Sequence, residues 1–238
     1  MGAESLRAWL EYLESQGRLL RVRREVSPVY ELAAVTQAAE GKGAILFEKV
    51  AGYGMPVASN VCAERELFAR ALGLKKGALI ETYRRAIESP RACELIDDAP
   101  FRAVGFDGPI DLLSFLPLPI YHEGDAGPYL TAALLIARDP ETGYRNVSIN
   151  RLQALGGERL GVLILPGHLR QCFESAARRG MDLDVAIVIG APPAVLLASQ
   201  AIVPFEVDEL EIASALSPEG PLALSPCETV PLEVPRDA

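Results

Sequence analysis

Polar and charged side chains gather in residues 122–151, around two apolar runs joined by a turn. The run LTAALLIA is typical of a strand, DPETG places Pro and Gly where a turn needs them, and NVSIN alternates with a period of two. This segment is therefore predicted to be a hairpin that presents ligand-binding groups. On the second strand, alternation predicts that Asn146, Ser148 and Asn150 share one face. Val147, Ile149 and Arg151 are expected on the other face, unless the strand bends or ends there.

Arg151 directly follows the alternating run and has the chemistry of a carboxylate clamp. Its guanidinium fork matches both oxygens of a carboxylate, so Arg151 is a candidate to hold an acidic substrate beside a cofactor. A surface ion pair with Asp139 or Glu141 is the simpler alternative. Another polar set, equally consistent with a loop cap, precedes the Gly-Pro pair at residues 127–128: His122, Glu123 and Asp125.

Asn146, His168 and Glu209 have side chains that suit a divalent metal ion, although spacing alone does not bring them together. An amide oxygen, an imidazole and a carboxylate fit an ion of the Mn or Mg type that keeps positions open for phosphate oxygens. His168 stands at the start of an expected helix, and because a helix N-terminus favours an anion, its imidazole could meet a phosphate or a phosphate-bound metal. The simpler alternative is an exposed histidine at a helix start that binds no ligand. Glu209 lies in an acidic run that is also typical of a solvated face.

The first part of the chain alternates helices and strands, which favours a small α/β unit. Helices are expected at residues 5–16, with Ser5 as N-cap, at 28–39 and at 64–72. Strands are expected at residues 19–26, 44–47 and 55–61.

Residues 90–119 loosen into connections rich in Pro, Gly and Asp, which places a domain boundary near residue 115. Two helices are expected after it, at residues 167–179 and 191–200, and five strands, at residues 129–137, 145–152, 160–165, 184–189 and 222–224. This spacing favours a barrel-like domain with helical insertions. The expected fold is thus α/β (α+β), with residues 1–115 as one domain and 116–238 as the other.

Composition limits the class of protein. Half of the 238 residues are apolar, which is enough for a sizeable core, and the net charge of −9 argues against a nucleic-acid surface. The four cysteines are far apart and nothing resembles a signal peptide, so we expect reduced thiols in the cytoplasm. No apolar run reaches the roughly 18 residues of a membrane span, so a soluble protein is expected. Residues 186–199 lack both common nucleotide-loop patterns.

Segments along nearly the whole chain carry a family likeness. The main ones are LPLPIYHEGDAGPYLTAALLIARDPETGYRNVSINRLQ, PGH, VAIVIGAPPAVLLAS, VDELEIASAL and CETVPLEVP. In this order they closely resemble the UbiD-type reversible decarboxylases. The segments SLRAWLEYLESQGRLLRVRREVSPVYELA and ILFEKVAGYGMPVASNV are similar to the first domain of that family.

The resemblance implies prenylated FMN bound in a split β-barrel, with its phosphate held by Mn2+ and K+. Asn146, His168 and Glu209 match the divalent-metal ligands, and Ser199 matches part of the monovalent-cation site. The whole cofactor-binding set that the resemblance implies is Asn146, Ser148, Ile149, Arg151, His168 and Ser199. Arg151 is the residue that it implies to be catalytic, on the substrate side.

The activity that the resemblance implies is non-oxidative, reversible decarboxylation of an aromatic or α,β-unsaturated acid, with the cofactor supplied by a flavin prenyltransferase. Two departures stand out. Gly167 replaces a glutamine that often precedes the metal histidine, and the sequence ends before the acidic EGPFGE-like segment and the oligomerisation domain of the family. We therefore expect a fragment or one piece of a split enzyme, completed by a homo-oligomer or a partner chain. The alternative is a non-catalytic flavin-binding or assembly subunit.

Overall fold

The computed structural model describes residues 3–75, 77–106 and 108–238. Helix α1 (Leu6–Ser15) follows Ser5, whose hydroxyl accepts a hydrogen bond from the N–H of Ala8 at 3.0 Å. The predicted N-cap is thus confirmed. Trp9 and Leu13 are buried on the inner face of α1, as its apolar spacing requires.

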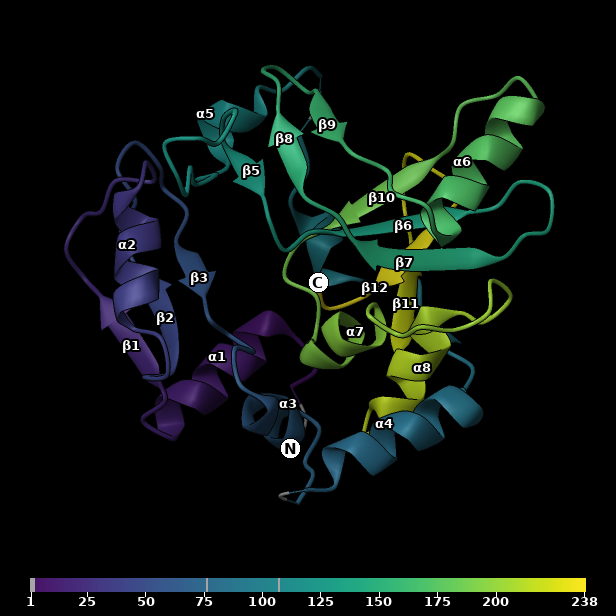
Figure 1. Ribbon diagram of the computed structural model, residues 1–238, viewed down its shortest axis with the longest axis horizontal. Helices are drawn as coiled ribbons and strands as arrows, with labels where there is room; N and C mark the ends of the chain where they lie inside the picture. Colours follow the sequence, from purple (N-terminus) through teal and green to yellow (C-terminus); the bar gives the residue numbers. More distant parts are fainter. Residues whose placement is uncertain (1–2, 76, 107) are drawn as a thin grey trace.

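The first sheet contains β1 (Leu19–Val22), β2 (Ala44–Phe47) and β3 (Val57–Ser59). β1 pairs with β2 in parallel, and β2 pairs with β3 antiparallel. Helix α2 (Glu31–Ala38) supplies the crossover that a parallel pair needs. With α1, these elements form the α/β unit at the left of Figure 1.

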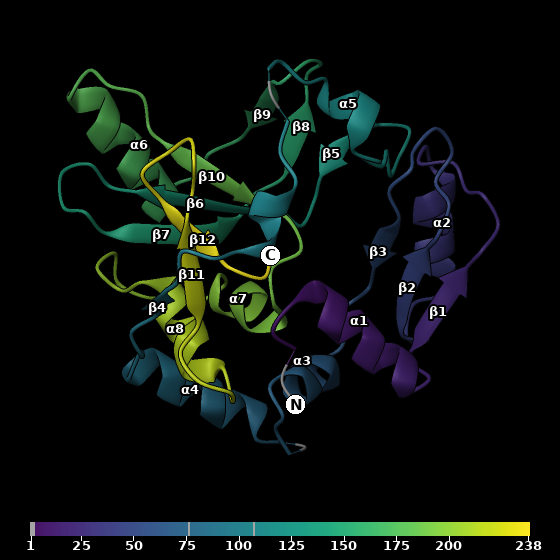
Figure 2. The ribbon, with the colours of Figure 1, turned by 180° about the vertical axis from the view of Figure 1, so that it is seen from behind.

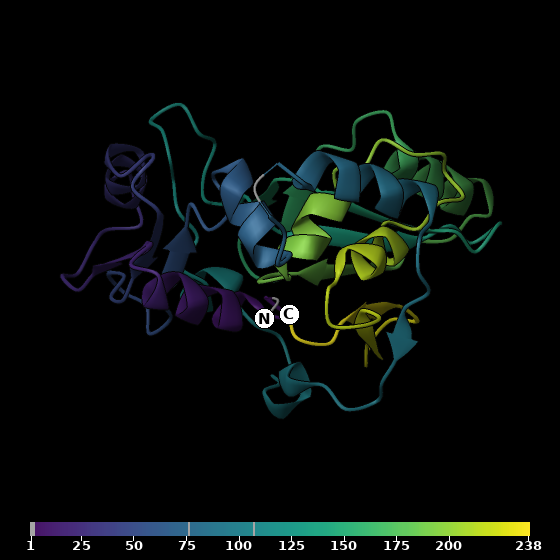
Figure 3. The ribbon, with the colours of Figure 1, turned by 90° about the horizontal axis from the view of Figure 1, so that it is seen from below.

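The next elements lead into the second half of the chain: α3 (Arg65–Ala71), α4 (Leu79–Glu88), β4 (Glu94–Leu95), a 3-10 helix (Pro100–Ala103) and α5 (Leu112–Phe115). The sequence prediction did not include α4. This helix packs against α8 (Glu209–Leu216), and the two lie side by side in Figure 3. The boundary near residue 115 stays a prediction.

The sheet at the centre of the second half has the order β10-β6-β7. Its strands are β6 (Leu134–Arg138), β7 (Arg145–Ile149) and β10 (Val185–Val188), all antiparallel. β6 is buried on both faces, because Leu134 and Ile136 belong to one apolar cluster and Leu135 and Ala137 to another. Burial on both sides explains its unbroken apolar sequence.

A second sheet, of order β5-β8-β9, continues this hairpin. It contains β5 (Tyr129–Leu130), β8 (Leu152–Ala154) and β9 (Leu160–Val162). The predicted strands at 129–137 and 145–152 are therefore each divided, at residues 131–133 and at residues 150–151. Unequal lengths at the two breaks are typical of a bulge, which bends a strand pair and redirects its side chains. The bend lies at Asn150 and Arg151.

Three helices enclose the central sheet: α6 (His168–Arg178), α7 (Pro193–Ala198) and α8. In Figures 1 and 2, α7 and α8 lie below the sheet and α6 lies beside the end of β7. Val195 of α7 and Leu210 and Ile212 of α8 pack in the same cluster as Ile136 and Val147 of the sheet. The sequence prediction did not identify α8, because its first turn reads as an acidic surface run.

A further sheet joins distant segments: β11 (Ala223–Pro226) pairs antiparallel with β12 (Glu233–Pro235) and in parallel with β4. In the described part of the chain the strands form four three-stranded sheets, so the mixed α/β class is confirmed. Cys62, Cys93, Cys172 and Cys227 are all free thiols. Among the described residues no helix is long and apolar enough to cross a membrane.

Candidate cofactor and metal site

Asn146, His168 and Glu209 come together from three elements. Asn146 is in β7, while His168 and Glu209 are the first residues of α6 and α8. Asn146 Nδ2 donates a hydrogen bond to Glu209 Oε1 at 3.1 Å, and His168 Nδ1 lies 3.7 Å from that same oxygen. The His168 side chain is 22% exposed. The fold thus groups the three residues that the resemblance implies as metal ligands.

Glu209 is a buried carboxylate, with its side chain only 4% exposed. Its Oε2 accepts a hydrogen bond from the N–H of Val147 at 2.9 Å. Burial raises the pKa of Glu209, and nearby Asp208 raises it too, whereas the hydrogen bond from Val147 and the proximity of His168 lower it. The net direction is upward, so the negative charge is incompletely compensated, and a bound cation would compensate it.

The chemistry of this group fits a divalent cation. At 3.7 Å, the gap between His168 Nδ1 and Glu209 Oε1 is too long for a hydrogen bond. Neighbouring ligands of one octahedral ion, with bonds of about 2.1 Å, are roughly 3 Å apart, so the two atoms would move closer together on binding such an ion. The Asn146 amide turns Nδ2 toward Glu209, and an amide flip would present its oxygen. Among the described residues no group of three or more His, Cys, Asp and Glu could hold an ion, so a site here needs the amide as its third ligand.

The N-terminus of α6 lies beside this group and has no side-chain cap. Its N-cap is Gly167, in extended backbone with φ 162°, and a Cβ there would meet no atom within 4 Å. The first N–H groups of α6 are therefore available to an anion such as a phosphate. A residue with a Cβ would also fit this extended backbone.

A row of polar side chains leads from this group to a cavity. Ser148 Oγ donates a hydrogen bond to Asn146 Oδ1 at 3.3 Å, and Asn150 Nδ2 donates to Ser148 Oγ at 3.0 Å, so the predicted shared face is confirmed. The cavity measures about 880 Å³, and Ile149, Asn150 and Arg151 line it. Small-molecule and cofactor sites typically measure roughly 300–1,000 Å³.

Arg151 is exposed on the wall of this cavity. The surface ion pair with Asp139 or Glu141 does not form: Asp139 Oδ2 accepts from Thr142, and Glu141 pairs with Arg178. Within residues 3–75, 77–106 and 108–238, Arg151 makes no ion pair. Its guanidinium is therefore free to bind an anion in the cavity.

The polar loop before β5 contributes partly to the cavity. Asp125 Oδ2 accepts hydrogen bonds from the N–H groups of Tyr121 and His122, at 3.1 and 3.0 Å, so Asp125 is a loop cap. His122 and Asp125 line the cavity. Glu123 is exposed and does not line it.

Ser199 lies at the C-terminal end of α7 and is buried. Its Oγ donates a hydrogen bond to Leu196 O at 2.9 Å, and Gln200 Nε2 donates to it at 3.3 Å. In the described part of the chain no hydrogen bond joins it to Asn146, His168 or Glu209. Its place in a monovalent-cation site stays a prediction.

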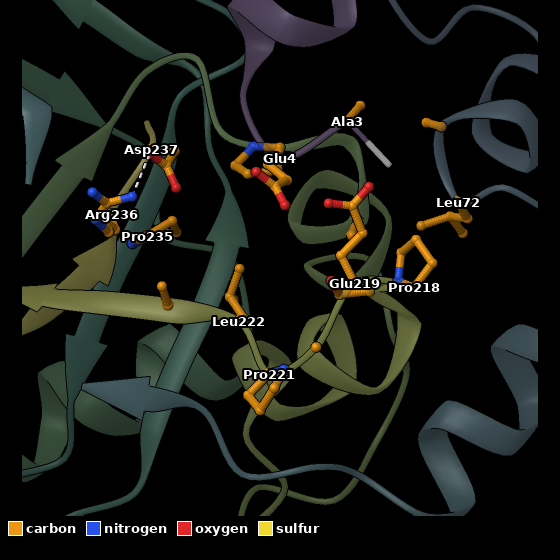
Figure 4. A pocket seen from close by; sticks show the side chains of 16 residues that line it. Ala3, Glu4, Leu72, Pro218, Glu219, Pro221, Leu222, Pro235, Arg236 and Asp237 are labelled. Carbon is orange, nitrogen blue, oxygen red and sulfur yellow. Dashed lines mark hydrogen bonds and ion pairs between the residues drawn. The ribbon is translucent and has the colours of Figure 1, made fainter. Parts of the chain in front are cut away.

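A smaller cavity of about 180 Å³ contains none of the predicted residues. Both terminal segments line it, and the carboxyl groups of Glu4 and Glu219 face each other there (Figure 4). It is not the candidate site.

Sequence reasoning missed two supports of the group formed by Asn146, His168 and Glu209. The guanidinium of Arg145, with its side chain 9% exposed, pairs with Asp208 at 2.6 Å and with Glu233 at 2.9 Å. It thereby ties β7 to the N-terminus of α8 and to β12. The other support is an aromatic contact between His168 and Phe205. The sequence signal for the Arg145 ion pairs was a basic residue next to Asn146 together with the acidic run around Glu209.

Comparisons with known proteins identify the family of this chain. Residues 95–238 match the family model UbiD, described as the 3-octaprenyl-4-hydroxybenzoate carboxy-lyase Rift-related domain, and residues 10–87 match that family's N-terminal domain model. The chain is 37% identical over 221 residues to an anhydromevalonate phosphate decarboxylase of Methanothermobacter thermautotrophicus, covering 91% of this chain and 50% of that protein.

Two solved structures extend the likeness to the fold. One is an evolved dimeric form of the UbiD-class enzyme HmfF from Pelotomaculum thermopropionicum in complex with prFMN, with TM-score 0.96, 52% identity, and coverage of 99% of this chain and 55% of that one. The other is the vanillic acid decarboxylase of Sedimentibacter hydroxybenzoicus in closed form, with TM-score 0.91, 30% identity, and coverage of 98% and 52%. The chain spans about half the length of the curated relatives it matches.

Proposed function

Because the chain belongs to the UbiD family, we propose that it forms the flavin-binding part of a carboxy-lyase. The reaction would be non-oxidative, reversible decarboxylation of an aromatic or α,β-unsaturated acid. Two of the similar proteins are decarboxylases, and a third, a UbiD-class enzyme, was solved with prFMN, which supports this class.

The proposed ligands of Mn2+ are Asn146, His168 and Glu209, and Ser199 belongs to the proposed K+ site. Free N–H groups at the start of α6 suit the flavin phosphate. Prenylated FMN, when bound, supplies the electron-accepting chemistry that loss of CO2 requires. Ser148 and Ile149 are proposed to contact this cofactor, because they lie between the metal group and the cavity.

Arg151 is proposed to hold the substrate carboxylate. Its exposed guanidinium stands in the cavity beside apolar side chains, including Leu163 and Leu165, which are 77% and 66% exposed. An acid with an apolar body would place its carboxylate on the guanidinium and its body on these leucines.

The observation that carries this proposal is the grouping of Asn146, His168 and Glu209 next to a cavity in which Arg151 has no ion-pair partner. If Asn146, His168 and Glu209 only stabilised the fold, that role would explain the hydrogen bonds of the buried Glu209. It would not explain why the guanidinium of Arg151 has no ion-pair partner in the adjacent cavity.

The test is decarboxylation by the protein co-expressed with a flavin prenyltransferase, measured as CO2 release and CO2 exchange over a panel of aromatic and unsaturated acids. Arg151→Ala should lower kcat/KM roughly 10- to 100-fold, the worth of a charge-assisted hydrogen bond. Arg159→Ala is the matched control, because Arg159 is exposed in the β8–β9 turn and does not line the cavity.

A companion chain or a second copy is part of the proposal. One similar structure is a dimeric form, and another is a two-component vanillic acid decarboxylase. The assays are therefore repeated with candidate partner chains. Bound flavin and metal without turnover in every combination would favour a non-catalytic flavin-binding subunit instead, and equal activity in Arg151→Ala would remove Arg151 from the substrate site.

A further inference from the structure

An aromatic ring contacts His168, and a second ring packs against the first. The Phe205 ring contacts the imidazole edge to face, with centroids 5.4 Å apart and an interplanar angle of 62°. Tyr144 in turn packs against Phe205 at 5.8 Å and 89°. Phe205 lies on the connection from α7 to α8, and Tyr144 lies in the turn between β6 and β7.

The position of Phe205 is fixed by its chain neighbours. A turn closed by a hydrogen bond from Val207 N–H to Pro204 O, at 3.1 Å, contains it. Asp208, three residues further on, caps α8 by accepting from the N–H of Leu210 at 2.8 Å, and Arg145 of β7 binds its carboxylate. Phe205 is therefore part of a braced segment that ends at Glu209.

His168 itself has little polar restraint. Its Nδ1 is 3.7 Å from Glu209 Oε1, and in the described part of the chain the imidazole makes no hydrogen bond. An imidazole at the start of a helix can rotate about χ1 and χ2, so directing it toward one oxygen costs rotamer entropy. The contact with the Phe205 ring restricts this rotation.

We propose that Phe205 is a positioning residue that keeps the imidazole of His168 directed at Glu209, with Tyr144 supporting Phe205 from behind. This inference rests on the proposed metal function of His168. It predicts that the His168 imidazole is oriented before an ion binds, and residues that orient metal ligands are typically worth about 10-fold or more in metal affinity.

Proton NMR tests the contact without any cofactor. The chain has only two histidines, so the two sets of imidazole signals are assigned with His168→Gln. At one fixed alkaline pH, the His168 ring protons should show a ring-current shift from Phe205. Phe205→Leu, which keeps apolar bulk, should move these signals toward random-coil positions, while Phe205→Tyr should preserve the shift. The His122 signals serve as the internal reference.

Binding of Mn2+ alone, measured by electron paramagnetic resonance of the free ion, is the second readout. Phe205→Leu should weaken binding about 10-fold, Phe205→Tyr should restore it, and Tyr144→Ala should have a smaller effect. Unchanged His168 signals or unchanged Mn2+ affinity in Phe205→Leu would overturn the inference, while leaving the metal site standing. Wild-type protein that binds Mn2+ no better than His168→Gln would instead refute the proposed metal function.

Discussion

In the described part of the chain, the Asn146 amide and the N–H of Val147 donate hydrogen bonds to the carboxylate of Glu209, and the His168 imidazole lies 3.7 Å from it. Because burial raises its pKa, it favours the folded state below its ordinary pKa and loses that contribution as the pH rises through the raised value. At neutral pH its charge therefore costs stability in the metal-free protein. A cation that binds to Glu209 would offset this loss of stability, which would explain why a buried carboxylate stands there.

Glu209→Gln should accordingly raise the melting temperature of the metal-free protein. The substitution removes the buried charge, and the glutamine amide oxygen can still accept the hydrogen bond from the N–H of Val147. The gain should grow as the pH rises. Saturating Mn2+ should reverse the order: with free ion at about 100 times its Kd, the wild type gains about 2.7 kcal/mol and the variant little. Thermal melts with and without Mn2+ measure both effects. A variant that Mn2+ stabilises as strongly as the wild type would remove Glu209 from the site.

At the residue scale, the sequence identified the members of the metal group only through the family likeness. Asn146, His168 and Glu209 stand at no spacing that predicts contact, since they approach through the packing of α8 and α6 on β7. The shared face of Asn146 and Ser148 did follow from strand alternation. The roles of Ser148, Ile149, Arg151 and Ser199 stay predictions.

At the scale of elements, the bend after β7 determines what the hairpin presents. Local periodicity predicted continuous strands at 129–137 and 145–152, because apolar runs carry no signal for the point at which a strand passes from one sheet to another. The missed helices have a similar cause. The charged residues of α4 mask its apolar spacing, and the helix buries only Ala86. The acidic first turn of α8 is typical of a surface segment, although this helix buries Leu210, Ile212 and Leu216.

The junction of β7, α8 and β12 depends on Arg145. Arg145→Met should destabilise the protein by about 3 kcal/mol, because it takes the cation away from the largely buried carboxylate of Asp208, whereas Glu233 keeps its pair with Arg138. Arg178→Met is the control: its pair with Glu141 is exposed, so its loss should cost less than about 1 kcal/mol. Denaturant unfolding compares the two, and equal losses would show that the buried pairs of Arg145 contribute no more to stability than the exposed pair of Arg178.

At the scale of the whole molecule, the two terminal segments meet at the smaller cavity (Figure 4). A hydrogen bond with Glu219 raises the pKa of Glu4, as do partial burial and the charges of Glu219 and Asp237, while Arg236 lowers it. The pair therefore stabilises the fold at low pH and loses this contribution as the pH rises above the ordinary carboxyl pKa.

Glu219→Gln should make the protein more stable than the wild type above this range, by less than about 1 kcal/mol because solvent screens the pair. The advantage should disappear in acid. Melting temperature as a function of pH is the measurement, with Glu11→Gln, on the exposed face of α1, as the control. Parallel curves for wild type and Glu219→Gln would contradict the coupling.

His168 is proposed to belong to a metal site that holds a flavin phosphate. The direct measurement is the content of Mn2+ and flavin in protein purified after co-expression with a flavin prenyltransferase, by elemental analysis and absorbance. The wild type should contain both, His168→Ala should lose both together, and His122→Ala should keep its Mn2+. A His168→Ala protein that retains wild-type Mn2+ would contradict the account.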